Sequence, residues 1–161
     1  MLIGIISDTH GIIRQPNVLK KIKNLITNTD ILIHLGDYTN DIKYITEDYK
    51  GKIYAVKGNG DFGDKYPKEQ IINVLDYKIL ICHGDNYRVN FGLNNLYYKA
   101  KELGVSIVFY GHTHISLIEE YDGIMFLNPG STSFPRGTSK QSMGFLKIHE
   151  DGKKDAYLKM L

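Results

Sequence analysis

The sequence has a single cysteine and no long apolar run, and each absence excludes a class of protein. One cysteine, Cys82, cannot form an intrachain disulfide, which excludes the small secreted domains that disulfides hold together. No apolar run approaches the roughly 18 residues of a membrane-spanning helix. The N-terminal residues contain no basic segment and reach an aspartate at Asp8, unlike a signal peptide. We therefore expect a soluble, cytoplasmic protein.

The sequence also has little excess charge of either sign. Its 20 basic and 18 acidic residues leave a formal net charge of +2, which is too small to favour stable binding to nucleic acid or to an anionic membrane. Hydrophobic residues make up 42% and charged residues 24% of the chain, which excludes intrinsic disorder. Because domains average about 150 residues, we predict a single domain over residues 1–161.

The first 60 residues alternate between short apolar runs and amphipathic segments. Residues 1–7, 31–35 and 52–56 are apolar and rich in β-branched side chains, which predicts strands buried on both faces. A helix is predicted to begin at Pro16, because proline favours the first turn of a helix, and a short helix is predicted over 40–48. This β-α-β-α-β order predicts parallel strands joined by right-handed crossovers.

The remaining residues predict hairpins. Short apolar runs flank tight turns, among them an Asp-Gly pair of the kind typical of two-residue hairpin turns. Apolar residues at helical spacing predict a helix over 93–103 that stops at Gly104. The predicted strands are 70–75 and 78–83 around Asp76-Tyr77, 106–110, 115–121 and 124–127 around Asp122-Gly123, and 143–149 and 155–160 around Asp151-Gly152.

Side chains that can bind metal stand where the predicted strands end. Ligands of α/β proteins bind beyond the carboxyl ends of the strands, so residues far apart in the sequence converge there. Glycines accompany nearly all of these side chains and allow the sharp turn that follows each strand. The set comprises Asp8, His10, Asp37, Asn59, His83, His112 and His114.

The composition of this set favours two metal ions over one. Four imidazoles, two carboxylates and one amide make seven groups, and a single tetrahedral metal would leave three of them unused. Two ions that share a bridging carboxylate would use all seven. Because no thiol belongs to the set, mixed nitrogen and oxygen ligation favours Mn, Fe, Zn or Ni over soft-metal or iron–sulfur sites.

Each motif alone also has a structural interpretation. Asp37 and Asn59 stand beside glycines, as turn residues do, and His83 could be a hydrogen-bonded histidine of the core. His112 and His114 give a stronger signal, because side chains two residues apart on an extended segment point the same way. All five motifs stand at strand ends, which makes chance assembly a poor explanation.

These motifs resemble those of a known family. The calcineurin-like metallophosphoesterases have five similar blocks, and small YfcE-type phosphodiesterases of this family have a similar Asn128-Pro129-Gly130-Ser131 segment; the retromer subunit shares their fold. The resemblance spans residues 1–133 and implies an α/β fold, a four-layer α-β-β-α sandwich of two mixed sheets. The blocks are Asp8-Thr9-His10, Gly36-Asp37, Gly58-Asn59-Gly60-Asp61, His83-Gly84 and Gly111-His112-Thr113-His114.

The resemblance also implies a metal centre and a reaction. Each of two divalent transition-metal ions would have three ligands of its own, Asp37 would bridge them, and a hydroxide between the ions would attack phosphorus in a phosphodiester or related phosphoester. Mn²⁺ or Ni²⁺ is preferred, with Zn²⁺, Fe²⁺ or Mg²⁺ as alternatives. The implied ligands are Asp8, His10 and His114 for one ion and Asn59, His83 and His112 for the other; the implied catalytic residues are Asp37, Asn59, Asp61 and His83.

One position departs from the wider family. Gly60 stands where many members have a histidine that is taken to protonate the leaving group or bind phosphate, although YfcE-type members lack it too. General acid catalysis contributes about 10²–10⁴-fold, so its absence favours substrates with good leaving groups. Asp61 would orient the loop or a water molecule instead.

Several other residues have two open interpretations. His34 either packs in the core or supports the site from behind. Arg136 is the arginine preferred for gripping phosphate. Phe62, Tyr66 and Phe134 either form an aromatic rim for a nucleobase or aryl group or pack as ordinary surface residues. The loop 60–69 is a candidate active-site loop.

The resemblance leaves two classes of function. The first is a phosphoric ester hydrolase acting on a small phosphoester, with nucleotide-like compounds among the candidates. The alternative is a non-catalytic protein-binding scaffold of the retromer-subunit type, with the same fold and a degraded site. All seven ligand positions hold competent ligands, which favours the enzyme. The family resemblance further implies a homodimer or tetramer.

Overall fold

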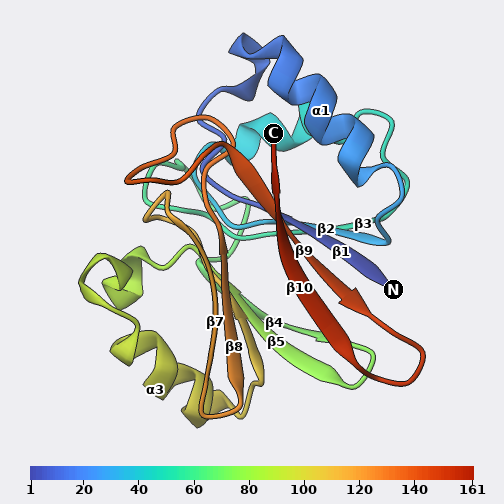
Figure 1. The fold of residues 1–161 in the computed structure, drawn as a ribbon. Helices are drawn as coiled ribbons and strands as arrows, with labels where there is room; N and C mark the ends of the chain where they lie inside the picture. Colours follow the sequence, from blue (N-terminus) through green and yellow to red (C-terminus); the bar gives the residue numbers. More distant parts are fainter.

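Ten strands form two five-stranded sheets in the computed structural model, which describes residues 1–161 (Figure 1). The first sheet has the order β10-β9-β1-β2-β3 and the second the order β4-β5-β6-β8-β7. The first contains β1 (Leu2–Ile6), β2 (Ile31–His34), β3 (Lys52–Ala55), β9 (Ser142–Ile148) and β10 (Lys154–Met160). The second contains β4 (Glu69–Val74), β5 (Tyr77–Cys82), β6 (Ile107–Phe109), β7 (Ser116–Tyr121) and β8 (Ile124–Pro129).

The helices lie on the outer faces of the two sheets (Figure 1). The α-helices are α1 (Pro16–Ile26), the single turn α2 (Ile42–Ile45) and α3 (Asn94–Leu103), and short 3₁₀ turns are η1 (Ile12–Arg14), η2 (Thr39–Asp41), η3 (Asp85–Tyr87) and η4 (Val89–Phe91). No helix has the length and apolar character needed to span a bilayer.

Three separate apolar clusters fill the spaces between these layers. Alternate side chains of both sheets, such as Ile5 and Phe109, pack between the sheets, since successive strand residues point to opposite faces. The opposite face of the first sheet packs against α1 through residues such as Ile22. The outer face of the second sheet packs against α3 through residues such as Leu96. Three interfaces require four layers, so the predicted α-β-β-α sandwich of two mixed sheets is confirmed.

Most predicted elements are confirmed, and two are corrected. The strands β1, β2 and β3 run parallel, as the β-α-β-α-β pattern predicts. The helix predicted over 40–48 is only η2 and one turn of α2; the Thr46 hydroxyl donates to the Ile42 carbonyl at 2.8 Å, a bond that competes with helix propagation. The first hairpin turns at Leu75 and Asp76, one residue earlier than the predicted Asp76-Tyr77 turn. Tyr77 instead pairs with Val74 and packs on the core between the sheets.

This topology gathers strand ends at one edge of the molecule. The loops after β1 and β2 are joined where the Asp8 amide donates to the Gly36 carbonyl at 3.0 Å. The loops after β5 and β6 are joined where the Gly111 amide donates to the His83 carbonyl at 2.9 Å. The first pair belongs to one sheet and the second pair to the other, so the residues that follow these strands meet between the sheets.

Candidate metal centre

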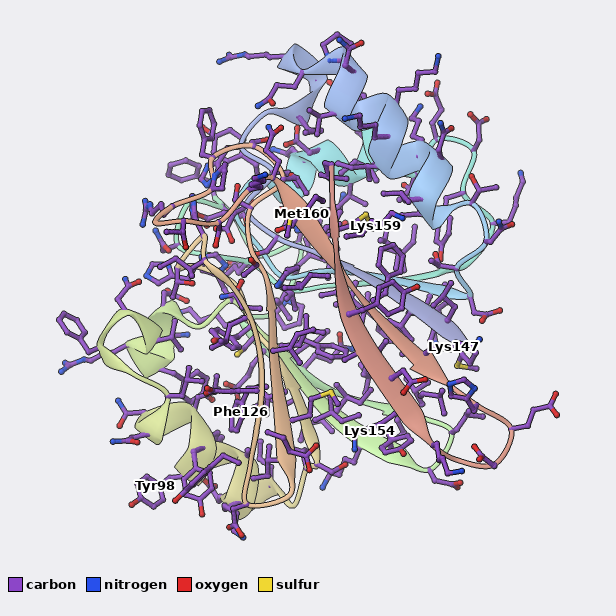
Figure 2. All side chains as sticks on the ribbon, viewed as in Figure 1. Tyr98, Phe126, Lys147, Lys154, Lys159 and Met160 are labelled. Carbon is purple, nitrogen blue, oxygen red and sulfur yellow. The ribbon has the colours of Figure 1, made fainter.

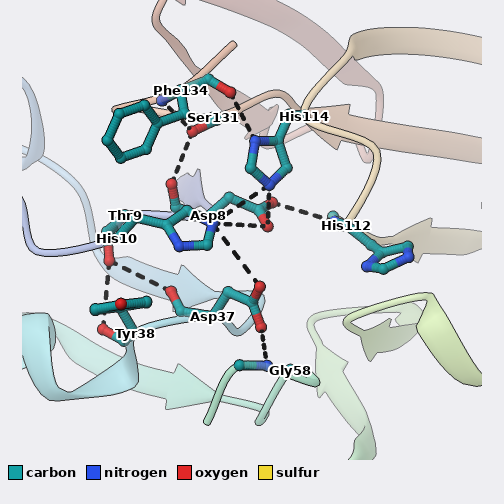
Figure 3. Close-up of polar contacts among 12 residues, drawn as sticks. Asp8, Thr9, His10, Asp37, Tyr38, Gly58, His112, His114, Ser131 and Phe134 are labelled. Carbon is teal, nitrogen blue, oxygen red and sulfur yellow. Dashed lines mark hydrogen bonds and ion pairs between the residues drawn. The ribbon is translucent and has the colours of Figure 1, made fainter. Parts of the chain in front are cut away.

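Metal-capable side chains from both sheets meet at these strand ends (Figure 3). Asp8 and His10 follow β1, and Asp37 follows β2. His83 follows β5 in the second sheet, and the segment with His112 and His114 follows β6. The His112 amide donates to Oδ2 of Asp8 at 3.1 Å, which ties the two sheets together at the site.

A first group of donor atoms surrounds the Asp8 carboxylate. Its Oδ1 lies 3.1 Å from Nε2 of His114 and 3.9 Å from Nε2 of His10, and the two imidazole nitrogens are 3.3 Å apart. Oδ1 is fully buried, yet it has no aligned hydrogen-bond partner in the protein. A buried carboxylate oxygen without a partner is costly, and a cation held between these three side chains would satisfy it.

A second group lies on the other side of Asp37. Oδ2 of Asp37 is 3.8 Å from Nε2 of His10, whereas its Oδ1 is 3.4 Å from Nε2 of His83. Nε2 of His83 is in turn 3.3 Å from Nδ1 of His112. The two oxygens of Asp37 therefore face different groups of imidazoles, which is the arrangement that a shared carboxylate ligand requires.

Backbone carbonyls fix the orientation of two of the imidazoles. Nδ1 of His83 donates to the Leu35 carbonyl at 2.8 Å, and Nδ1 of His114 donates to the Phe134 carbonyl at 2.6 Å. Each bond places the ring proton on Nδ1 and leaves the Nε2 lone pair facing the carboxylates. Metal-binding histidines are held in this way by a partner on the other ring nitrogen, so the residues present fit a divalent transition metal.

The electrostatics of the site favour the ligand forms of most of these groups. Burial lowers the pKa of both His10 and His112, which keeps their imidazoles neutral. Burial alone would raise the pKa of Asp8, but contact with His114 and the charge of His83 bring it below its usual value. For His114, burial opposes protonation, while the neighbouring Asp8 prevails and raises the pKa. Binding of a cation would therefore displace a proton mainly from His114.

The backbone at the site is strained. Asp8, His10, Asp37, His112 and His114 all have positive φ, between 43° and 69°. Side chains other than glycine rarely adopt this conformation, which costs on the order of 1–3 kcal/mol per residue. Five such residues within one cluster indicate that the fold holds these side chains in place for function.

Carboxylates that face away from the cluster hold its loops. Asp61 accepts hydrogen bonds from the amides of Asp37, Thr39 and Gly58 at 2.7–3.0 Å and from the Thr39 hydroxyl at 2.9 Å. Asp61 is thus placed to orient the loops, one of its two predicted alternatives. Asp41 accepts from the amides of Gly11 and Ile12 at 2.8 and 3.0 Å; sequence reasoning missed it, because an aspartate beside a short helix is unremarkable.

His34 lies behind the site and has both of its predicted roles. It is fully buried, and burial lowers its pKa to about 4, so its ring is neutral. Nε2 contacts the Thr9 hydroxyl at 3.2 Å, and Nδ1 accepts from the Gly36 amide at 3.2 Å. His34 therefore connects the loops after β1 and β2 without reaching the donor cluster.

Asn59 is placed differently from the other expected ligands. It is exposed in the turn between Gly58 and Gly60 and has no hydrogen-bond partner within the protein. The Gly60 amide next to it donates to Oδ1 of Asp37 at 2.7 Å, so this turn lies directly against the second group. Asn59 is free to turn its amide oxygen toward a ligand.

The aromatic residues near the site only partly match the expected rim. Phe134 and Tyr38 lie beside the His10 ring, with ring centroids 5.9 and 4.9 Å away, and both are exposed (Figure 3). Sequence reasoning missed Tyr38. Phe62 is fully exposed, and Tyr66 lies under the Lys65 ammonium instead.

Gly58 is expected to tolerate no side chain. An added Cβ would lie 2.2 Å from Oδ1 of Asp37 and 2.9 Å from the His83 ring, so Gly58→Ala should displace the Asp37 carboxylate and lower the metal content of the protein. Elemental analysis after dialysis against metal would measure this. Gly60→Ala is the matched control, because its Cβ would lie 3.1–3.2 Å from the same carboxylate. Equal metal content in both variants would contradict the assignment of Asp37.

Comparison with known proteins identifies relatives of this chain. Residues 1–151 match the calcineurin-like phosphoesterase superfamily domain. A probable metallophosphoesterase of Methanocaldococcus jannaschii is 38% identical over 160 residues, which cover 98% of this chain and 80% of that protein. A phosphodiesterase of the same organism is 33% identical over 148 residues, which cover 81% of this chain and 83% of that protein.

Solved structures share the fold. An archaeal phosphodiesterase superposes with a TM-score of 0.75 and 27% identity over 99% of this chain and 100% of the other. A single mutant of Vps29 from Entamoeba histolytica superposes with a TM-score of 0.79 and 22% identity over 99% of this chain and 98% of the other. At this lower identity, the second likeness concerns the fold alone.

Proposed function

The chain belongs to the calcineurin-like phosphoesterase superfamily, and from this membership and the site geometry we propose that it hydrolyses phosphodiesters with two divalent transition-metal ions. The observation that carries the proposal is the position of Asp37. Its two oxygens face two separate groups of imidazoles, at 3.8 Å from His10 and 3.4 Å from His83. A single mononuclear site would not need a carboxylate shared in this way.

Each ion has its own set of candidate ligands in this proposal. Bound there, divalent cations supply charge stabilisation for the phosphoryl oxygens and lower the pKa of water. Ni²⁺ is preferred because imidazole nitrogen suits it, and Mn²⁺ because carboxylate and amide oxygens suit it. Asp8, His10 and His114 would hold one ion, and Asn59, His83 and His112 the other, with Asp37 shared.

The protein's own groups position the site and the substrate. The carbonyls of Leu35 and Phe134 keep the imidazoles of His83 and His114 in their ligand tautomer. Asp61 holds the loops that carry Asp37 and Gly58. Arg136 is exposed, and its charge acts on His114, so its guanidinium is available to bind phosphate oxygens at the mouth of the site.

A protein-binding scaffold is the alternative function. The Vps29 structures support it through fold alone, at 22% identity for the Entamoeba histolytica mutant. The donor groups around Asp8 and Asp37 in this chain favour the enzyme. Metal content discriminates the two, because a scaffold has no need to retain about two ions per chain.

Removal of metal should abolish hydrolysis of a 4-nitrophenyl diester. Mn²⁺ or Ni²⁺ should then restore the rate far better than Ca²⁺, because calcium prefers sites made only of oxygen and four imidazoles belong to this one. The assay is the release of 4-nitrophenolate after chelation and after addition of each ion. Full activity after exhaustive chelation would refute the proposal.

Two histidine variants provide the control for this experiment. His114→Ala removes a donor beside Asp8 and should lower both metal content and rate. His149→Ala removes a histidine that pairs with Asp155 outside the site, at 2.7 Å, and should change neither.

A further inference from the structure

A cavity lies between α3 and the edge strand β7, beside the metal centre. Its volume is about 520 Å³, which is within the range of small-molecule sites. Phe126 forms part of its inner wall and is buried against the α3 side of the sheet, whereas Tyr98 points from α3 into solvent (Figure 2). The cavity is thus a gap between the sheet and the helix layer.

The walls of the cavity are mainly apolar. Eight of its thirteen lining residues are hydrophobic. Leu117 and Tyr121 lie on the outer face of β7, and Ile115 directly precedes this strand. Leu93 and Tyr97 face them from the start of α3. Ile115, Leu117 and Tyr121 remain 36–64% exposed, and a contiguous exposed apolar surface of this kind indicates a binding site.

One end of the cavity lies next to the metal centre. Thr113, which lines the cavity, stands between His112 and His114 in the sequence. Asn90 also lines it, and its side-chain amide lies 2.9 Å from Nε2 of His112. A molecule in contact with the second group of ligands therefore has this cavity directly beside it.

The charges of the cavity determine which part of a substrate fits. Glu119 is its only charged lining residue, and no cation lines it. A phosphate group would be repelled there and belongs at the metal centre, which leaves the cavity to an uncharged organic group. A diester carries such a group next to its phosphate.

We propose that this cavity binds an apolar ester group, aryl or branched alkyl, of the phosphodiester substrate. The proposal rests on the proposed function and narrows its substrate class to phosphodiesters with at least one bulky apolar alcohol. Burying a phenyl-sized group adds about 10–100-fold in affinity.

The test compares two symmetrical diesters that have poor leaving groups. Dibenzyl phosphate and dimethyl phosphate are titrated by calorimetry into the full-length, Mn²⁺-loaded protein. Dibenzyl phosphate should bind about 10–100-fold more tightly. Leu117→Trp should fill the cavity and reduce this preference to less than about threefold. Ile115→Trp provides a second obstruction, from the residue that precedes β7.

Ile71→Trp is the matched control. Ile71 is 39% exposed on β4 and Leu117 is 36% exposed on β7, and these strands are the opposite edges of one sheet. The control should keep the full preference for dibenzyl phosphate. All three variants should retain the wild-type metal content, because none of the three positions belongs to the metal centre.

Two results distinguish a wrong assignment of the cavity from a wrong proposal of phosphodiester hydrolysis. Equal binding of the two diesters, or an undiminished preference in both the Leu117 and Ile115 variants, would overturn the cavity assignment even in an active enzyme. A preference that the Leu117 and Ile115 variants abolish, in a protein that hydrolyses no diester, would support the cavity and refute the enzyme.

Discussion

Asp37→Asn should reduce the proposed phosphodiesterase activity about a thousandfold while the protein stays folded and as stable as the wild type. Asparagine keeps one oxygen to accept the Gly60 amide, a bond of 2.7 Å in the wild type. The change removes one of two carboxylate charges from a buried cluster. A neutral amide can then no longer offer a charged oxygen to each of the two groups of imidazoles. A loss of about 4 kcal/mol of charge stabilisation corresponds to about a thousandfold in rate.

Asp61→Asn should lower the stability of the protein and leave most of its activity, the reverse of the result expected for Asp37→Asn. Its four hydrogen bonds come from donors, three of them backbone amides, so the new amide group would face N–H groups that it cannot accept from. Hydrogen bonds to charged groups contribute about 1.5–3 kcal/mol each, and we expect a loss of about 2–4 kcal/mol in the free energy of unfolding. Molecules that retain their metal should keep most of their activity.

The two variants are compared by urea unfolding, metal content and the rate per metal-loaded chain. Equal rate losses at equal metal content would contradict the separation of roles, and would make Asp61 a direct participant in the reaction. A stable Asp37→Asn variant with a normal rate would contradict the proposal that Asp37 is shared by two metal ions.

The donor set could be predicted from the sequence because its members obey a topological rule. Asp8, Asp37 and His83 each stand just after an apolar strand, and the strand ends of both sheets meet at one edge. The sandwich itself followed from the family resemblance, since strand pattern alone does not specify that two sheets pack face to face.

The groups that hold the donors could not be predicted. The carbonyls of Leu35 and Phe134 orient two imidazoles, and a backbone carbonyl has no signature in the sequence. Asp41 and Asn90 act on residues far along the chain, and their roles depend on how loops pack. The apolar cavity beside His112 depends on the spacing between α3 and β7, which no local pattern encodes.

The rate of hydrolysis should fall steeply as the pKa of the leaving alcohol rises. Gly60 offers no acid, and its amide is already bonded to Asp37. The expected penalty on a poor leaving group is the usual contribution of a general acid, about 10²–10⁴-fold. A series of methyl aryl phosphates with substituted phenols measures the slope of log(kcat/KM) against leaving-group pKa. A flat dependence would mean that another group supplies the proton.

Gly60→His should flatten this slope if residue 60 faces the leaving group. The structure removes one obstacle, because Gly60 does not have positive φ and its backbone conformation is open to other residues. The remaining obstacle is the contact of a new Cβ with the Asp37 carboxylate at 3.1–3.2 Å, which the loop must relieve by a few tenths of an ångström. Histidine has an unperturbed pKa of about 6.5 and can protonate an alkoxide near neutral pH.

Gly60→Ala separates the acid from this steric effect. It introduces the same Cβ without an acid, so it should lower all rates by a similar factor and keep the wild-type slope. Metal content is measured first, and both variants should retain about two ions per chain. In Gly60→His, the rate of hydrolysis of substrates with poor leaving groups should then rise relative to that of substrates with good leaving groups. This increase should disappear above the pKa of the histidine, where the ring has lost its proton. Equal slopes in the two variants, with the metals intact, would mean that residue 60 does not face the leaving group and that the steep dependence has another cause.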